Sequence, residues 1–307
     1  RYRHSPRRRK EKMNEIKIAI SGKEQIYHTP AAFDEMTREQ FILTAEQLIH
    51  AAAGIESESY YTSMTGIEKK SWNKLHFFQR YSIKRLFDFI SVPEMSKQLL
   101  PYIEIDISLN GTRNTEYETD SPFSVLRSPC SEKFIGYQPG FSNTTWQEFI
   151  FADQYIMNGK YREAAACLYR PQRTDYNGET DRRIPFTIYG TNSRMQFFNN
   201  IPEAELLAFV LNYKALRKRN LEEKYSFVFV ERRTEHDEME HGETEHGTRS
   251  PSSVFRAPFS WVGIHRDLMG DRFYDETKFY ELNVHVILNR LNSVIKDNRK
   301  PKLTTNH

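Results

Sequence analysis

The chain has 307 residues, of which 38% are hydrophobic and 13% aromatic, and its formal net charge is +3. This length can bury the core of one large domain or two ordinary ones, and the aromatic share predicts that Phe, Tyr and Trp supply much of the buried area. The two cysteines, Cys130 and Cys167, form neither a disulfide framework nor a CxxC pair, which favours a reducing compartment. No apolar run approaches the roughly 18 residues that span a bilayer, so we predict no membrane association.

The first twelve residues carry most of the positive charge. Residues 1–12 hold seven Arg or Lys and one Glu, a formal charge of +6, which leaves −3 for the rest of the chain. We expect this segment to be a disordered basic extension upstream of a natural start at Met13. Binding of nucleic acid by this arm is the alternative.

Residues 13–100 are predicted to form a β-hairpin followed by a helical subdomain. The stretch "EIKIAISGKEQIYHTP" alternates apolar and polar residues around Ser21 and Gly22, which indicates the hairpin. Thr37 precedes Gln40 by three residues, as in a capping box, and predicts a helix over 37–53. Its apolar stripe comprises Phe41, Ala45, Leu48, Ile49 and Ala52.

Gly66 is expected to end one helical segment and to precede a long amphipathic helix that stops before Pro93. The stripe of this predicted helix is Leu75, Phe78, Ser82, Leu86 and Ile90. Residues 101–143 are rich in turn formers and are interpreted as a connector with one strand at 103–107.

Residues 144–300 are predicted to form a helical domain. Thr145 and Glu148 have capping-box spacing, and a helix with the apolar residues Trp146, Phe149, Ile150 and Ile156 is expected to end at Asn158 and Gly159. "KYREAAACLYR" predicts a second helix that folds back on the first and ends before Pro171.

Further helices are predicted from Pro202, around 261–268 and over 275–296. The third helix should bury Leu206, Leu207, Val210 and Leu211, with the basic residues Arg217, Lys218 and Arg219 near its C-terminus. Residues 231–253 are acidic and rich in His and Glu, and we expect a mobile loop there. The fold class is therefore mainly α, a helical bundle-like body with a small N-terminal β-hairpin and irregular connectors.

No motif predicts a catalytic, cofactor-binding or metal-binding residue, since GxSxG, P-loop, GxGxxG and HExxH patterns are absent from the sequence. His236, His241 and His246 recur every five residues, which suggests a metal site. On a helix this spacing would separate them by about 140°, so they would not face a single metal ion. The segment 175–181 resembles a calcium loop, but its glycine comes too early, so a polar turn is the better interpretation. Glu68 with Lys69 and Lys70 is interpreted as a helix start.

Five residues are candidates for partner binding: Trp72, Trp146, Tyr169, Arg170 and Trp261. Each tryptophan stands near a predicted helix start, where it could anchor the core or form an interface hot spot. Tyr169 and Arg170 belong to "LYRP", either a helix C-terminus with the arginine near free carbonyls or a corner that docks an acidic partner.

The order of "TPAAFDEMTREQFI", "MTGIEKKSWNKL", "TWQEFIFADQYI" and "LYRP", closed by a tryptophan-centred helix, resembles helical proteins encoded among the virion and tail genes of tailed bacteriophages, especially those infecting Bacteroidetes. The resemblance covers most of the chain from about Thr29 to Lys296. It implies a tail-assembly chaperone or morphogenesis factor. The basic arm and the His/Glu-rich segment depart from the pattern.

Two functions follow as hypotheses. The first is a non-enzymatic assembly or interaction protein in the cytoplasm of the bacterial host, or associated with the virion, that binds a phage tail protein or another virion component and needs no cofactor. The second is a nucleic-acid-associated protein that uses the basic arm with Arg217, Lys218 and Arg219. The sequence predicts no oligomeric state.

Overall fold

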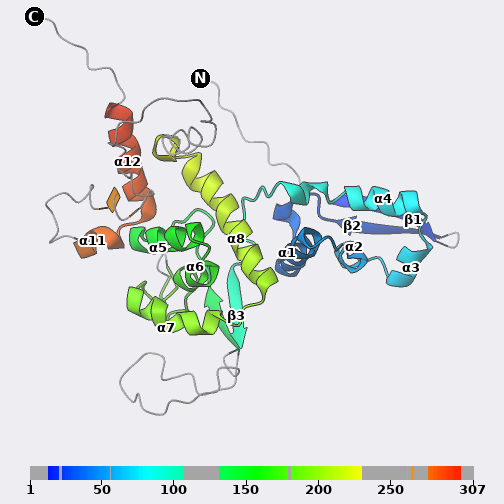
Figure 1. Cartoon of the computed structure of the whole chain (residues 1–307), viewed down its shortest axis with the longest axis horizontal. Coiled ribbons are helices and arrows are strands. Elements are labelled where there is room, and N and C mark those ends of the chain that lie inside the picture. Colours follow the sequence, from blue (N-terminus) through cyan, green and yellow to red (C-terminus); the bar gives the residue numbers. More distant parts are fainter. Residues whose placement is uncertain are drawn as a thin grey trace, which may run out of the picture. The chain divides into compact units, whose positions relative to one another are not determined.

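The computed structural model confirms a mainly α fold with a small N-terminal β-hairpin (Figure 1). It describes residues 13–20, 23–55, 57–106, 131–178, 181–229, 261, 264–265 and 276–298. The expectations for residues 1–12 and for 231–253, together with most of the predicted 261–268 helix, fall outside these residues. The chain divides into two compact units, Arg1–Leu100 with Pro202–Ala215, and Pro101–Ile201 with Leu216–His307.

The first unit begins with the predicted hairpin. Strand β1 (Asn14–Ile20) pairs antiparallel with β2 (Lys23–Thr29), and Ile16 lies opposite Tyr27. Ile16 and Ile18 are buried while the residues between and beside them are exposed or half-buried. This alternation places one face of the hairpin against the core.

The helices that residues 1–100 contribute to the first unit follow the hairpin. They are η1 (Phe33–Glu35), α1 (Arg38–Ala52), α2 (Glu58–Thr65), α3 (Lys69–Lys74), α4 (Phe77–Arg85) and η2 (Asp88–Ser91). The predicted capping box is present, because Thr37 accepts from the Gln40 amide and Gln40 accepts from the Thr37 amide. Phe41 and Ala45 of the predicted stripe are buried, whereas Ala52 is exposed.

The long helix predicted before Pro93 is wrong, because the chain breaks it into α3, α4 and η2. Leu75 adopts an extended backbone, and His76 starts α4 with a capping box of its own to Gln79. Because α4 starts anew after His76, the side chains that face the core differ from those of the predicted continuous helix. Leu75 and Ile83 are buried, but Phe78 of the predicted stripe is 68% exposed.

The predicted third helix is α8 (Glu203–Arg217), which continues into a π-helical turn, η4 (Lys218–Glu222). Residues 202–215 belong to the first unit. Arg38 forms an ion pair with Glu205 there, and buried Asn212 accepts from the Leu99 amide at 3.2 Å. The predicted subdomain 13–100 is therefore completed by a segment from much later in the chain.

The second unit starts with a pair of strands. In contrast to the predicted connector over 101–143, β3 (Tyr102–Asp106) pairs antiparallel with β4 (Ser131–Ile135), and Ile103 lies opposite Phe134. Both of these side chains are buried. The single strand expected at 103–107 thus has a partner that the sequence pattern did not indicate.

The predicted helical hairpin is formed by α5 (Trp146–Met157) and α6 (Tyr161–Leu168), and α6 also packs against α7 (Ile188–Phe198), as Figure 1 shows. Gly159 joins α5 to α6 with φ +70°, a conformation that favours glycine.

The helix predicted over 275–296 is interrupted. It consists of α11 (Glu276–Glu281) and α12 (Val284–Asn298). Asn283 causes the break, because its amide group donates to the carbonyls of Ser142 and Thr144 and its side-chain oxygen accepts from the His285 amide.

Within the residues that the structure describes, no helix is both long enough and apolar enough to cross a membrane.

Candidate functional site

The structure buries all five of the candidate partner-binding residues. Trp72, Trp146, Tyr169 and Trp261 are 0% exposed and Arg170 is 1% exposed. Trp72 stacks with Tyr61 in the first unit, whereas the other four lie in the second unit. Their burial favours core anchoring over direct contact with a partner.

Trp146 and Trp261 come together in the core of the second unit. Their rings meet edge to face at 5.3 Å. The Trp146 indole donates to Nδ1 of His265 at 3.2 Å, and the Trp261 indole donates to Asp153 at 2.6 Å. Each buried ring thus has a partner for its polar group, as buried tryptophans usually require.

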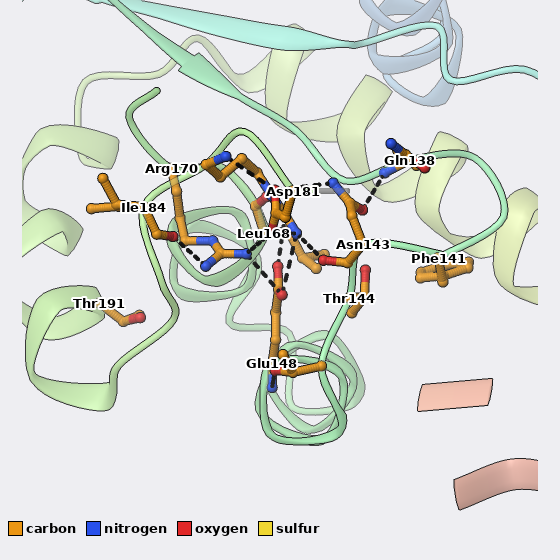
Figure 2. Close-up of polar contacts among 12 residues, drawn as sticks. Gln138, Phe141, Asn143, Thr144, Glu148, Leu168, Arg170, Asp181, Ile184 and Thr191 are labelled. Atoms are coloured by element: carbon orange, nitrogen blue, oxygen red, sulfur yellow. Dashed lines mark hydrogen bonds and ion pairs between the residues drawn. The ribbon is translucent and has the colours of Figure 1, made fainter. Parts of the chain in front are cut away.

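Arg170 belongs to a buried network of charges centred on Glu148 (Figure 2). Glu148 lies in the first turn of α5 and is 0% exposed. Its carboxylate accepts from Arg170 at 3.0 Å and from Arg183 at 2.8 Å. Asp181 contacts the same two arginines, at 3.0 Å from Arg170 and 2.9 Å from Arg183. Two guanidinium groups are therefore balanced by two carboxylates.

The network also supplies partners for backbone groups. Arg183 donates to the Leu168 carbonyl at the end of α6 and to the Asn143 carbonyl, and Arg170 donates to the Ile184 carbonyl. The backbone of Arg170 forms two hydrogen bonds with that of Ile135, the last residue of β4, in an antiparallel bridge. Arg170 and residues 181–184 are consequently fixed to α5, α6 and the β3–β4 sheet.

The charges of the network shift one another's pKa values. Burial raises the pKa of Asp181, but hydrogen bonds and charge from Arg183 and Arg170 outweigh it, so the net pKa is lowered. Burial lowers the pKa of Arg170. For Arg183 the two carboxylates outweigh burial, and its pKa is raised. The ionised forms of Asp181 and Arg183 thus stabilise each other.

Sequence reasoning assigned Glu148 to a capping box and missed this network. Thr145 does accept from the Glu148 amide at 3.2 Å, but the Glu148 carboxylate turns to the arginines. Arg183 and Asp181 lie in a segment without periodicity. Arg170 and Arg183 stand 22 and 35 residues from Glu148, so no local pattern indicates that they pair with it. A carboxylate inside a helix face that is otherwise apolar is the one sign that could have suggested a buried partner.

Two neighbouring cavities adjoin this network and share Arg173 and Pro185 in their walls. The smaller, about 410 Å³, is lined by Arg170, Asp181 and Arg183 among others. The larger, about 730 Å³, lies between α7 and the segment before it. Its size is in the range of ligand pockets, which are about 300–1,000 Å³.

The first unit presents a different feature, which we call the α4 aromatic surface: Phe77, Phe78 and Tyr81. Their side chains are 63%, 68% and 51% exposed. The Phe77 ring lies 5.6 Å from that of Phe78 and 6.3 Å from that of Tyr81. Three adjoining exposed rings are unusual, because large apolar side chains are mostly buried.

Two further possibilities are nucleic-acid binding by the basic residues Arg217, Lys218 and Arg219, and metal binding by acidic, histidine or cysteine side chains. Arg217 pairs with Asp153 at 2.7 Å and also with Glu222, whereas Lys218 and Arg219 are exposed. Among the described residues no group of three or more His, Cys, Asp or Glu side chains is placed to hold a metal ion. The three regularly spaced histidines of the His/Glu-rich segment lie outside those residues.

Comparison with known proteins identified no relative: no family model, curated protein or solved structure matches the chain.

Proposed function

We propose that this protein is a non-enzymatic assembly factor of a tailed bacteriophage, a tail-assembly-chaperone-like protein that binds a tail protein or another virion component in the cytoplasm of the bacterial host. The observation that carries the proposal is the α4 aromatic surface. The bacteriophage context comes from the sequence resemblance.

The α4 aromatic surface has the features of a protein-binding site. Aromatic side chains are enriched at interface centres because they bring a large contact area at low entropic cost. Helix α4 is held on its other face by buried Ile83, and its N-terminus is fixed by the His76 capping box. The exposed rings are therefore presented on an ordered helix.

Charged residues lie on the same helix as the rings, and two of them form ion pairs. Arg80 pairs with Glu58 at 3.3 Å, and Arg85 lies 3.6 Å from Asp88. An apolar centre with a polar rim is the usual anatomy of a protein interface. An amphipathic or extended apolar segment of the partner would fit such a surface.

The test is co-expression of the full chain with tail proteins of a bacteriophage from the resembling group, followed by purification and light scattering. We expect a defined complex and more soluble partner. Replacing Phe78 and Tyr81 together with serine should weaken the complex at least about tenfold without lowering the melting temperature, because both side chains are largely exposed. Val92→Thr is the control, since Val92 is 62% exposed but lies outside α4.

A complex of unchanged affinity in the double variant would overturn the role of the α4 aromatic surface. The nucleic-acid hypothesis predicts instead a salt-dependent complex with DNA or RNA that is lost on removal of residues 1–12. The internal ion pairs of Arg217 weigh against the second part of that hypothesis.

A further inference from the structure

Arg194 is a buried arginine with no carboxylate partner among the residues that the structure describes. It is 0% exposed, and one terminal nitrogen donates to the Ala166 carbonyl at 3.2 Å and to the Thr191 hydroxyl at 3.1 Å. Its Nε makes no hydrogen bond. The ion pairs found among the described residues involve Arg170 and Arg183 but not Arg194. Burial lowers the pKa of Arg194 to about 10, so the group stays cationic at neutral pH.

The larger cavity lies against this arginine. Its walls include the apolar side chains of Ile184, Pro185 and Phe197, together with Arg194. Gly190 leaves room at this wall, because a Cβ there would lie 2.8 Å from the Thr187 hydroxyl oxygen and 3.2 Å from Nη1 of Arg194. A pocket with an apolar wall and a few convergent polar groups is the common form of a ligand site.

The N-terminus of α7 adds to the positive potential of the cavity. The helix has 11 residues and begins after Thr187, whose hydroxyl accepts from the Gly190 amide at 3.0 Å. The first amides of a helix lack intrahelical acceptors, and the helix dipole favours an anion there. Thr187 and Gly190 both line the cavity.

The other charges of the cavity compensate each other. Arg173 holds Asp175 with two hydrogen bonds, at 3.0 and 2.9 Å. The excess positive charge therefore comes from Arg194 and the N-terminus of α7. An anionic partner would stabilise this charge, because a buried charge without one is energetically costly.

We propose that this cavity binds an acidic peptide segment, with a carboxylate attracted by the charge of Arg194 and by the N-terminus of α7, and with a neighbouring aromatic or aliphatic side chain against Ile184, Pro185 and Phe197. The identification of the ligand as a peptide rests on the proposed function. The cavity belongs to the second unit, so it is a binding site separate from the α4 aromatic surface.

The experiment uses two synthetic libraries of nine-residue peptides, identical except for Asp or Asn at the central position, with Phe, Leu, Ile, Ser and Gly varied around it. They are selected on the immobilised full chain, and the enriched peptides are measured by fluorescence anisotropy. We expect the Asp peptides to bind at least about tenfold more tightly than their Asn counterparts. Arg194→Gln, which keeps donors but no charge, should abolish this preference.

Tyr189 provides a second test, since it lines the cavity and is 84% exposed, so its replacement should leave the fold intact. Tyr189→Glu should weaken the Asp peptides much more than Tyr189→Ser does, because only glutamate adds a negative charge. Asn192→Ser is the control, since Asn192 is exposed on α7 but does not line the cavity.

Equal binding of Asp and Asn peptides, an acidic preference that persists in folded Arg194→Gln, or equal effects of the two Tyr189 variants would overturn the proposal. Failure of the proposed function gives a different pattern: Asp peptides bind, but no tail protein forms a complex with the full chain. If a tail protein forms a complex but Asp and Asn peptides bind equally, the proposed peptide site in the cavity is wrong and the proposed function is unaffected.

Discussion

Glu148 is the side chain on which the buried network depends most. It compensates both Arg170 and Arg183 at 0% exposure. Glu148→Gln keeps the shape but leaves a buried positive charge, and removal of one partner of a buried pair costs about 3–5 kcal/mol. We therefore expect a loss of this size in the free energy of unfolding, measured by urea denaturation monitored through tryptophan fluorescence.

A surface pair provides the control for Glu148. Asp175 contacts Arg173 at 2.9 Å, but its side chain is 71% exposed. Asp175→Asn should leave the denaturation midpoint nearly unchanged, because exposed pairs are screened by water. If both variants shifted the midpoint equally, the buried network would not have the stabilising role assigned to it.

His285 should make stability depend on pH near neutrality. Its Nε2 donates to the Gly140 carbonyl, so Nδ1 is the acceptor for the Tyr225 hydroxyl at 2.7 Å. Burial lowers the pKa of His285, and although the Gly140 carbonyl opposes this effect, the charge of Lys224 adds to it. In the folded protein the ring therefore stays neutral at a pH where the unfolded chain is already protonated.

The sign of the pH effect follows from proton binding. Below about pH 6.5, the ordinary pKa of histidine, the unfolded state binds more protons, so the unfolding free energy falls as pH falls toward the folded pKa. His285→Gln should reduce this slope by at most about 1.4 kcal/mol per pH unit. His265, whose pKa is also lowered, is still present in this variant, so part of the dependence of the unfolding free energy on pH should remain. Denaturation curves from pH 7 to 5 with the same slope in both proteins would contradict the assignment.

The turn between α5 and α6 depends on the backbone of one residue. Gly159 has φ +70°, and a Cβ at this position would meet no atom within 4 Å. Gly159→Ala should thus cost only the strain of the left-handed conformation, about 1–2 kcal/mol. Thermal unfolding of the variant measures it.

Gly140 is the matched control for this turn. A Cβ at Gly140 would also meet nothing within 4 Å, but its φ lies outside the positive range that strains other residues. Gly140→Ala should be neutral or slightly stabilising, because alanine restricts the unfolded chain. A similar loss in both variants would point to a cause other than backbone conformation.

Local patterns predicted the elements whose signals are local. The β1–β2 hairpin, the Thr37 cap of α1 and the α5–α6 hairpin each depend on residues within a few positions of one another. The helices predicted before Pro93 and over 275–296 were broken by His76 and Asn283. Asn283 acts through Ser142 and Thr144, more than 130 residues away in sequence, so no local pattern could reveal the break.

The same distinction applies to the candidate sites. The α4 aromatic surface was hidden because a long helix was expected to bury Phe78, and only the restart at His76 turns it outward. The cavity beside Arg194 requires α6, α7 and the segment around Ile184 to meet. The sequence shows that residue 194 is an arginine, but it does not show which distant segments pack around that side chain.

For the chain as a whole, the first unit is discontinuous, since residues 1–100 are completed by 202–215. Asn212 is 0% exposed, accepts from the Leu99 amide and donates to the Lys97 carbonyl at 3.0 Å. A fragment of residues 13–100 leaves these backbone groups without that partner. We expect it to unfold at lower urea concentration and less cooperatively than the full chain, as measured by circular dichroism.

Complementation in trans separates this cause from general truncation damage. A synthetic peptide of residues 201–217 should bind the 13–100 fragment and raise its denaturation midpoint, because binding to the folded state stabilises it. Asn212→Ala in the peptide should weaken binding about tenfold, since an unsatisfied buried backbone group costs about 1–3 kcal/mol. Lys214→Ala, at an exposed position, should bind like the natural peptide. If the fragment alone unfolded like the full chain, α8 would not be part of the first unit's stable fold; if the two variant peptides bound equally, Asn212 would not be the contact through which α8 completes it.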